Sequence, residues 1–165
     1  MEPVLRPFRP DDCAAIARMW NESREAWPGG DSGELTAEMV RRREAEADYI
    51  SLNVIELGDR IVGYCRVMAE TGHPEYAYLE LLNVSPDCHG RSFGRMLVHR
   101  AVQDAVDAKL RMFDIHTWSS NMKAMPLYKK TGFYWVPDTS VYMQNYAPQI
   151  VHLPATKSFF DEHDW

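Results

Sequence analysis

Residues 79–97, LELLNVSPDCHGRSFGRML, constrain this chain more than any other stretch. They run from an apolar segment through a polar turn into a helical pattern. This order brings backbone N–H groups and a helix N-terminus to one point. Gly90 and Gly94 let the backbone approach a bound group closely, and Arg91 and Arg95 add positive charge. The stretch therefore predicts a binding site for a phosphate group.

The bulk composition limits the class of protein. With 165 residues, 45% of them apolar and 25% charged, the chain resembles one soluble globular domain. Its net charge of −6 argues against a duplex nucleic-acid binder and fits a neutral or cationic small substrate better. Because no apolar run reaches the roughly 20 residues of a membrane span, we expect no membrane association.

The cysteines and the first residues indicate a compartment. Cys13, Cys65 and Cys88 are widely spaced and form no C-x-x-C pair, so they predict no disulfide framework. The first residues, MEPVLRPFRPDD, have acids and prolines where a signal peptide would be apolar. Both observations predict a cytoplasmic location.

Hydrophobic periodicity predicts an α/β fold. Three consecutive strands should form an antiparallel meander, and the full set of predicted strands is 4–8, 49–57, 61–70, 76–84, 111–118, 133–136 and 140–146. Helical spacing marks residues 10–20, 35–45 and 93–109, and a short helix within 119–131. Helices that follow a meander imply a mixed, mostly antiparallel sheet of six or seven strands with helices on both faces.

The same patterns predict the domain boundary and several buried residues. Residues 1–147 should form one domain, and residues 148–165 an extended aromatic and acidic tail. Asp11 or Asp12 should cap the first helix. The apolar sides of the next two helices should be buried, namely Leu35, Met39, Val40 and Ala45, then Phe93, Met96, Leu97, Ala101, Ala105 and Val106.

Two segments together resemble a known family. Residues 82–95, LNVSPDCHGRSFGR, resemble the acyl-CoA-binding segment of the GNAT superfamily of N-acetyltransferases, in which L-x-V-x-P leads into Q/R-x-x-G-x-G/A and a long helix. The next family motif resembles a second set of residues, Asn121, Ala124, Leu127, Tyr128, Gly132 and Phe133. The order and spacing of the segments also agree, and the resemblance covers residues 3–146. It implies the GNAT fold and transfer of an acetyl group from acetyl-CoA to a primary amine, without a metal.

The resemblance implies a set of coenzyme A contacts: Leu82, Asn83, Val84, His89, Gly90, Arg91, Ser92, Phe93, Gly94, Arg95 and Asn121. Two of these depart from the family pattern, since His89 replaces Gln or Arg and Ser92 replaces Gly. His89 can still donate one hydrogen bond. Ser92 adds a Cβ where the diphosphate should approach, and its hydroxyl would either contact a phosphate or cap the helix. These departures leave the strength of coenzyme binding open.

In the strand before the turn, the resemblance implies a β-bulge that splays this strand from the next one. The backbone N–H near Leu82 would then polarise the thioester carbonyl, and the backbone at Val84 would pair with the pantetheine arm.

Tyr128 is the predicted general acid, because a phenol can donate a proton to the thiolate that leaves when an amine attacks a thioester. The alternative is a helix tyrosine that packs its ring on the sheet with its hydroxyl in water. Glu80 is the predicted general base, on one strand face with Tyr78 and Leu82 by alternation. Its alternative is a surface glutamate in a salt bridge.

Other residues carry weaker signals. Asn121 fits either a coenzyme contact or a helix N-cap. The acids and histidine of residues 161–164 are better explained as a solvated tail than as a metal site. The acceptor amine should enter past the first two helices, near the acidic and aromatic residues of segment 21–34.

Three functions remain open from the sequence. The first is an active N-acetyltransferase whose acceptor is a small molecule or peptide. The second is a non-catalytic acyl-CoA sensor or scaffold, which the departures at His89 and Ser92 leave open. The third is an interaction domain that uses the aromatic tail. A homodimer is compatible with the family resemblance but does not follow from the residues.

Overall fold

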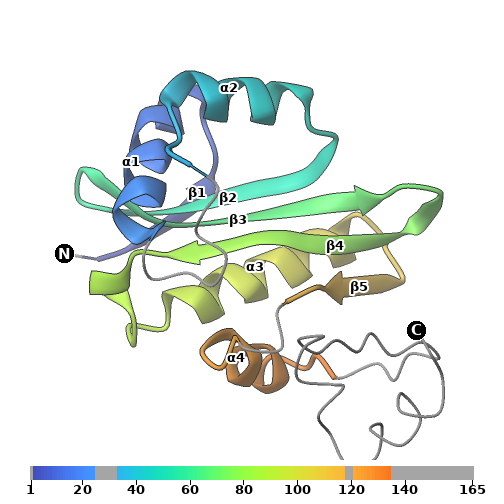
Figure 1. Cartoon of the computed structure of the whole chain (residues 1–165). Helices are drawn as coiled ribbons and strands as arrows, with labels where there is room; N and C mark the ends of the chain where they lie inside the picture. The colour runs from blue at the N-terminus through green and yellow to red at the C-terminus, as the bar shows by residue number, and fades with distance from the viewer. Residues whose placement is uncertain (1, 25–32, 118–120, 135–165) are drawn as a thin grey trace, which may run out of the picture. The chain divides into compact units, whose positions relative to one another are not determined.

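The computed structural model describes residues 2–24, 33–117 and 121–134. These residues contribute a five-stranded sheet in the order β1-β2-β3-β4-β5 (Figure 1). The strands are β1 (Val4–Pro7), β2 (Tyr49–Leu57), β3 (Arg60–Glu70), β4 (His73–Val84) and β5 (Met112–Ile115). The first four strands pair antiparallel and β5 pairs parallel with β4. The predicted mixed, mostly antiparallel sheet is therefore confirmed. Of the two further predicted strands, residues 133 and 134 are irregular and 140–146 lie outside the described residues.

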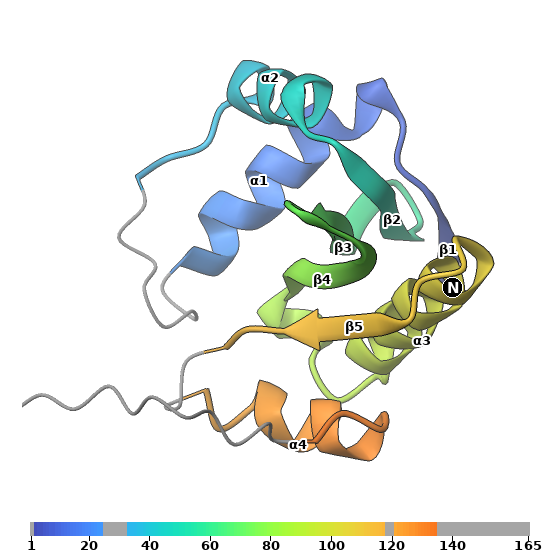
Figure 2. The same ribbon diagram turned by 90° about the vertical axis from the view of Figure 1, so that its right-hand side faces the viewer.

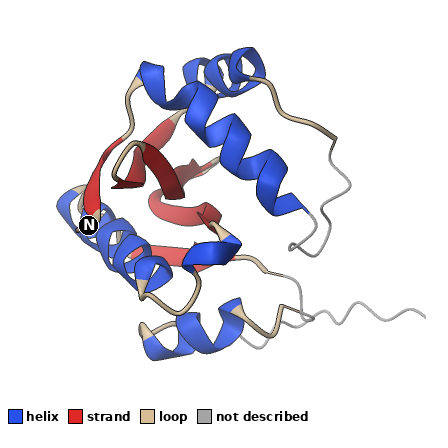
Figure 3. Ribbon diagram, turned by 90° about the vertical axis from the view of Figure 1, so that its left-hand side faces the viewer, coloured by secondary structure: helices blue, strands red, loops and turns tan. Residues whose placement is uncertain are grey.

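Helices cover both faces of this sheet, as the views along it show (Figures 2 and 3). The helices are α1 (Cys13–Ser23), α2 (Ala37–Glu46), α3 (Phe93–Asp107) and α4 (Ala124–Lys130), with short 3-10 turns η1 (Pro10–Asp12) and η3 (Pro86–Cys88). Helices α1 and α2 cover one face, and α3 covers the other. No helix in the described part of the chain is long and apolar enough to cross a membrane.

Each face of the sheet has its own hydrophobic core. Under α1 and α2, Ile16, Met19 and Val40 pack against Val54 and Tyr64 of the sheet. On the other face, Phe93, Leu97 and Ala101 of α3 pack against Val62 and Val67. Strands β2 and β3 supply both cores, which is why the middle of β2 and most of β3 are buried.

Several predictions about the helices were wrong. Met39 and Val106 are 50% and 60% exposed, while Glu44, one turn after Val40, is buried on α2. The first helix ends at Ser23, beyond the predicted range 10–20. There Asn21 anchors the chain, because its side-chain amide bonds both the N–H and the carbonyl of Leu35.

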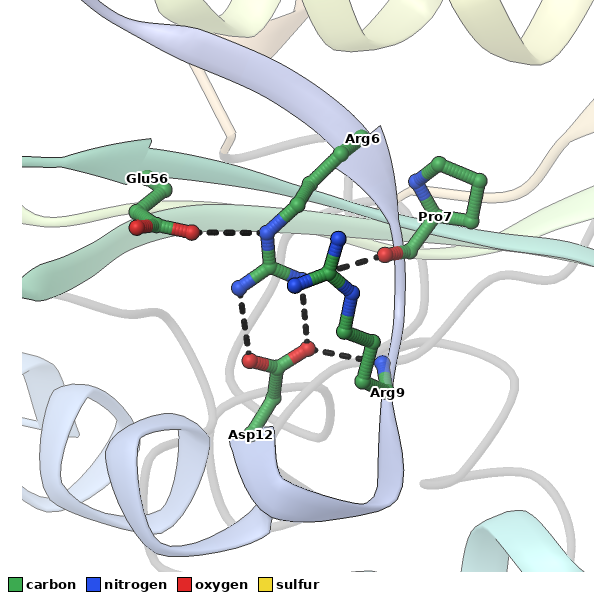
Figure 4. Close-up of polar contacts among 5 residues, drawn as sticks. All are labelled: Arg6, Pro7, Arg9, Asp12 and Glu56. Atoms are coloured by element: carbon green, nitrogen blue, oxygen red, sulfur yellow. Dashed lines mark hydrogen bonds and ion pairs between the residues drawn. The ribbon is translucent and has the colours of Figure 1, made fainter.

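The predicted cap of the first helix is also different. Neither Asp11 nor Asp12 caps α1 with its side chain. Instead, Asp12 accepts the N–H of Arg9 at 2.7 Å and two bonds from the Arg6 guanidinium at 2.8 Å (Figure 4). Arg6 also bonds Glu56 on the neighbouring strand at 2.6 Å. This network ties the entry of α1 to β1 and β2.

We expect Asp12→Ala to lower the free energy of unfolding by about 2 kcal/mol, because it removes charge-assisted bonds that are nearly buried. Burial acts to raise the pKa of Asp12, but the bonds from Arg6 and Arg9 outweigh it and hold that pKa below 3.8. The contribution of Asp12 is therefore fully present above pH 4 and is lost as the pH falls through its folded-state pKa.

Urea unfolding of the wild type and the variant between pH 7 and pH 2.5 measures this difference. Asp11→Ala is the matched control, since Asp11 is exposed and should change stability by less than about 0.5 kcal/mol. An Asp12→Ala effect that stays constant down to pH 2.5 would contradict the role given to its ionised carboxylate.

Candidate active site

A β-bulge in the central strand creates the main cleft. Across the β3–β4 pair, Arg66 faces Leu81 and Val67 faces Leu79, so Glu80 is an extra residue with no partner in β3. On the other side, pairing of β4 with β5 ends at Leu79 opposite Ile115. Beyond this point the two strands separate, as the resemblance implied. Predicted strand residues 116 and 117 leave the sheet and line the opening.

The cleft has a volume of about 1310 Å³. Its walls come from residues 79–84 of β4, the turn before α3, residues 116 and 117, the residues leading into α4, and α4 itself. Trp20 of α1 and Tyr64 of β3 also line it. Every predicted site residue except Arg91 lies on this lining: Glu80, Leu82, Asn83, Val84, His89, Gly90, Ser92, Phe93, Gly94, Arg95, Asn121 and Tyr128. Arg91 instead stacks its guanidinium on the Phe93 ring, 4.9 Å from the ring centroid.

The turn before α3 offers backbone donors. Gly90 and Ser92 both have positive φ, 79° and 66°, which turns successive N–H groups toward one side. Within the described part of the chain, the N–H groups of Gly90, Arg91 and Ser92 make no hydrogen bond. They lie directly before the first turn of a 15-residue helix. This arrangement suits an anion.

Gly94 allows close packing at the same point. A Cβ on Gly94 would lie 3.1 Å from the Leu127 side chain of α4, so a larger residue there would force that side chain to shift. The glycine therefore keeps the start of α3 close to α4.

The two departures from the family pattern have clear local effects. His89 Nε2 lies 3.0 Å from the carbonyl oxygen of Val84, so it can donate one hydrogen bond there. Ser92 takes the left-handed conformation that suits glycine, and its hydroxyl does not cap the helix. Instead, that hydroxyl accepts a bond from Arg95 at 3.2 Å. The capping alternative for Ser92 was wrong.

Tyr128 is half-buried on α4, with its ring edge against Phe133. Burial, with a smaller contribution from Cys65, raises the pKa of Tyr128 to about 12. The phenol therefore stays protonated through neutral pH and can donate a proton. Asn121 accepts the N–H of Ala124 at 3.2 Å and so stabilises the first turn before Tyr128.

The bulge changes which way Glu80 and its neighbours point. Leu79 and Leu82 both pack in the α3-side core, while Leu81 packs under α1 and α2. Strict alternation, which placed Leu82 on one face with Glu80, was therefore wrong. Glu80 points toward α2 and pairs with Arg66, which donates to its Oε2 atom at 2.6 Å through Nε. The Glu80 side chain remains 33% exposed.

Sequence reasoning missed the ion network behind Glu80. Arg66 is buried in β3 and also bonds Glu44 of α2 at 2.8 Å, and Arg43 bonds Glu44 as well. Burial acts to lower the pKa of Arg66, but its bonds to Glu44 and Glu80 outweigh it, so Arg66 keeps its charge. An arginine within the apolar run IVGYCRVMAE was the signal that a buried partner existed.

The site combines three features: a bulged central strand, a neighbouring strand that separates from it, and a glycine-containing turn before a long helix. The resemblance to the GNAT acetyltransferases implied this arrangement. Residues 16–133 match the family described as the acetyltransferase (GNAT) family, and this chain belongs to that family. The resemblance seen in the sequence is confirmed.

Solved structures share the fold. A GNAT acetyltransferase from Streptococcus pneumoniae is similar with a TM-score of 0.71 and 20% identity, covering 87% of this chain and 92% of that one. A Salmonella typhimurium protein, whose structure contains its cofactor acetyl-CoA, has a TM-score of 0.70 and 19% identity, with 87% and 88% covered.

A curated relative is also similar in sequence. The mycothiol acetyltransferase of Propionibacterium freudenreichii is 26% identical over 134 residues, which is 78% of this chain. The match spans 42% of that relative's length.

We expect Ser92→Gly to raise the free energy of unfolding by about 1 kcal/mol, because glycine adopts the left-handed conformation without a Cβ penalty. It should also tighten acetyl-CoA binding by opening the turn. Urea unfolding and calorimetric titration measure the two effects.

Lys109→Gly is the matched control. Lys109 also has positive φ, at 60°, but follows the other end of α3. It should gain similar stability without a change in acetyl-CoA affinity. A loss of stability in Ser92→Gly alone would show that the Arg95 contact outweighs the backbone strain.

Proposed function

We propose that this chain is an acetyl-CoA-dependent N-acetyltransferase that acts on the primary amine of a small molecule or peptide. The observation that carries this proposal is the end of β4–β5 pairing at the Glu80 bulge. It leaves residues 80–84 facing a cleft that also holds the unbonded N–H groups before α3 and the protonated phenol of Tyr128.

The turn residues would bind the coenzyme. The N–H groups of Gly90, Arg91 and Ser92 suit the diphosphate, and Arg95 adds positive charge beside them. The strand end at Leu82 and Val84 has no β5 partner, so its backbone can pair with an extended pantetheine arm. The N–H near Leu82 is the proposed donor to the thioester carbonyl oxygen.

Glu80 is the proposed general base and Tyr128 the proposed general acid. The acceptor amine must be neutral to attack, and Glu80 is the proposed group that takes its proton, directly or through water. Its Oε1 atom makes no hydrogen bond within the described residues, while Oε2 is held by Arg66. As the amine nitrogen bonds the carbonyl carbon and the carbon–sulfur bond breaks, Tyr128 donates its proton to the departing thiolate.

Calorimetric titration with acetyl-CoA and with free coenzyme A tests the coenzyme site. We expect micromolar binding of both ligands, because the turn keeps its donors despite the Cβ of Ser92. No binding at high ligand concentration would leave the fold intact but reject the acetyltransferase.

Tyr128→Phe distinguishes an enzyme from a non-catalytic acyl-CoA sensor. We expect kcat to fall by about 100-fold or more, because the departing thiolate loses its proton donor, while acetyl-CoA affinity stays unchanged. Release of free coenzyme A in an amine screen measures turnover. Tyr134→Phe, at a tyrosine that is 77% exposed and outside the cleft lining, is the control. Unchanged turnover in Tyr128→Phe would refute the proposed acid.

A further inference from the structure

Asn83 is a buried asparagine on the acceptor side of the cleft. It pairs across the sheet with Tyr64, and directly paired residues share a face. Tyr64 belongs to the core under α1 and α2. The next residue, Val84, packs in the core on the α3 side, where the coenzyme turn lies. The Asn83 side chain therefore points away from the coenzyme turn, toward α1 and α2.

The Asn83 carboxamide has no partner within the described structure. The residue is 5% exposed, and both its Nδ2 and Oδ1 atoms are buried without a hydrogen bond. Burying a polar atom unpaired costs about 1–3 kcal/mol, and native proteins leave few such atoms. Leucine fills nearly the same volume without this cost. The sequence thus keeps an amide where folding alone favours an apolar residue.

Tyr64, the residue paired with Asn83 across the sheet, also buries a polar group. It is fully buried, and its hydroxyl also lacks a hydrogen bond. Burial raises the pKa of the Tyr64 hydroxyl, and the neighbouring guanidinium of Arg43 acts in the opposite direction. Both Asn83 and Tyr64 line the cleft, as does Glu80, three residues before Asn83 on the same strand. Two neutral polar groups thus line the same cleft as the proposed base.

We propose that Asn83 and Tyr64 determine acceptor specificity by binding a neutral amide group next to the reactive amine. A carboxamide both donates and accepts hydrogen bonds. The ligand group that satisfies it best therefore also donates and accepts hydrogen bonds, as an amide does. The amine would lie at Glu80 and the amide at Asn83 and Tyr64. This inference rests on the proposed function and narrows the acceptor to amines with an adjacent amide.

Asn83→Leu should keep or raise the midpoint of thermal unfolding, because it removes two unpaired buried atoms. Asn53→Leu is the matched control. Asn53 is an equally buried strand asparagine, but its amide donates to Asp104 at 2.6 Å. Its replacement should lower the midpoint by about 3 °C or more. A similar fall in Asn83→Leu would overturn the proposal, since the amide would then have a structural role.

Selectivity is measured with two amines of similar shape, glycinamide and isobutylamine. The ratio of their kcat/KM values with acetyl-CoA should fall about tenfold or more in Asn83→Leu and in Tyr64→Phe. It should stay unchanged in Asn53→Leu. Comparing ratios between proteins cancels the different intrinsic reactivity of the two amines.

Binding supplies a readout that needs no turnover. Millimolar glycinamide, with or without coenzyme A, should raise the unfolding midpoint of the wild type more than isobutylamine does, and Asn83→Leu should remove this difference. The specificity proposal is overturned if the wild-type protein neither binds nor acetylates glycinamide better than isobutylamine. Failure of the proposed function is separate, because it appears as a lack of acetyl-CoA binding.

Discussion

The single unpaired residue at Glu80 is the constraint on which the rest of the site depends. Up to Leu79, β4 pairs with β3 on one side and β5 on the other. One extra residue increases the local twist and shifts the register, so β4 can keep β3 and leave β5. A continuous ladder would have closed this edge with hydrogen bonds. The bulge exposes backbone groups of a central strand to a cleft, where a ligand can use them.

The bulge is held by buried charge. Arg66 lies where the register shifts and bonds Glu80 on one side and Glu44 of α2 on the other. Arg66 and Glu44 are buried and Glu80 is partly exposed. A buried ion pair adds little net stability, because desolvation offsets most of the attraction. Removing one partner, however, would leave the others unpaired. The network therefore links the bulge in β4 to α2, the helix beside the proposed acceptor side.

The sequence predicted the regular parts of this structure because local pattern and tertiary burial agree there. Strands β2 and β3 are rich in apolar residues and end at a turn, and α3 presents Phe93, Leu97 and Ala101 at helical spacing. The prediction failed where pairing between distant segments decides which face of the sheet a side chain occupies. Nothing local shows that Glu80 is an extra residue, so alternation placed Leu82 on the wrong face.

The candidate site divides in the same way. The turn from Gly90 to Arg95 could be predicted because glycines, charges and a helix start are contiguous in the chain. The Arg66 network could not be assigned its partners, since Glu44 and Glu80 lie 22 and 14 residues away. For Asn121 the sequence left two alternatives, a coenzyme contact and a helix N-cap. In the structure its side chain stabilises the turn before α4 and also lines the cleft.

Three residues of the cleft lining depart from local rules. Ser92 adopts a backbone conformation that favours glycine, and the carboxamide of Asn83 is buried without a hydrogen bond to any residue that the structure describes. The hydroxyl of Tyr64 is fully buried beside it. Asn53, which does not line this cleft, is buried to a similar degree, but its amide donates to Asp104. Local inconsistency that clusters at a cleft is expected where selection acts on a ligand rather than on stability. Asn53 therefore has a structural role, whereas the buried amide of Asn83 is the one that we propose to bind a substrate.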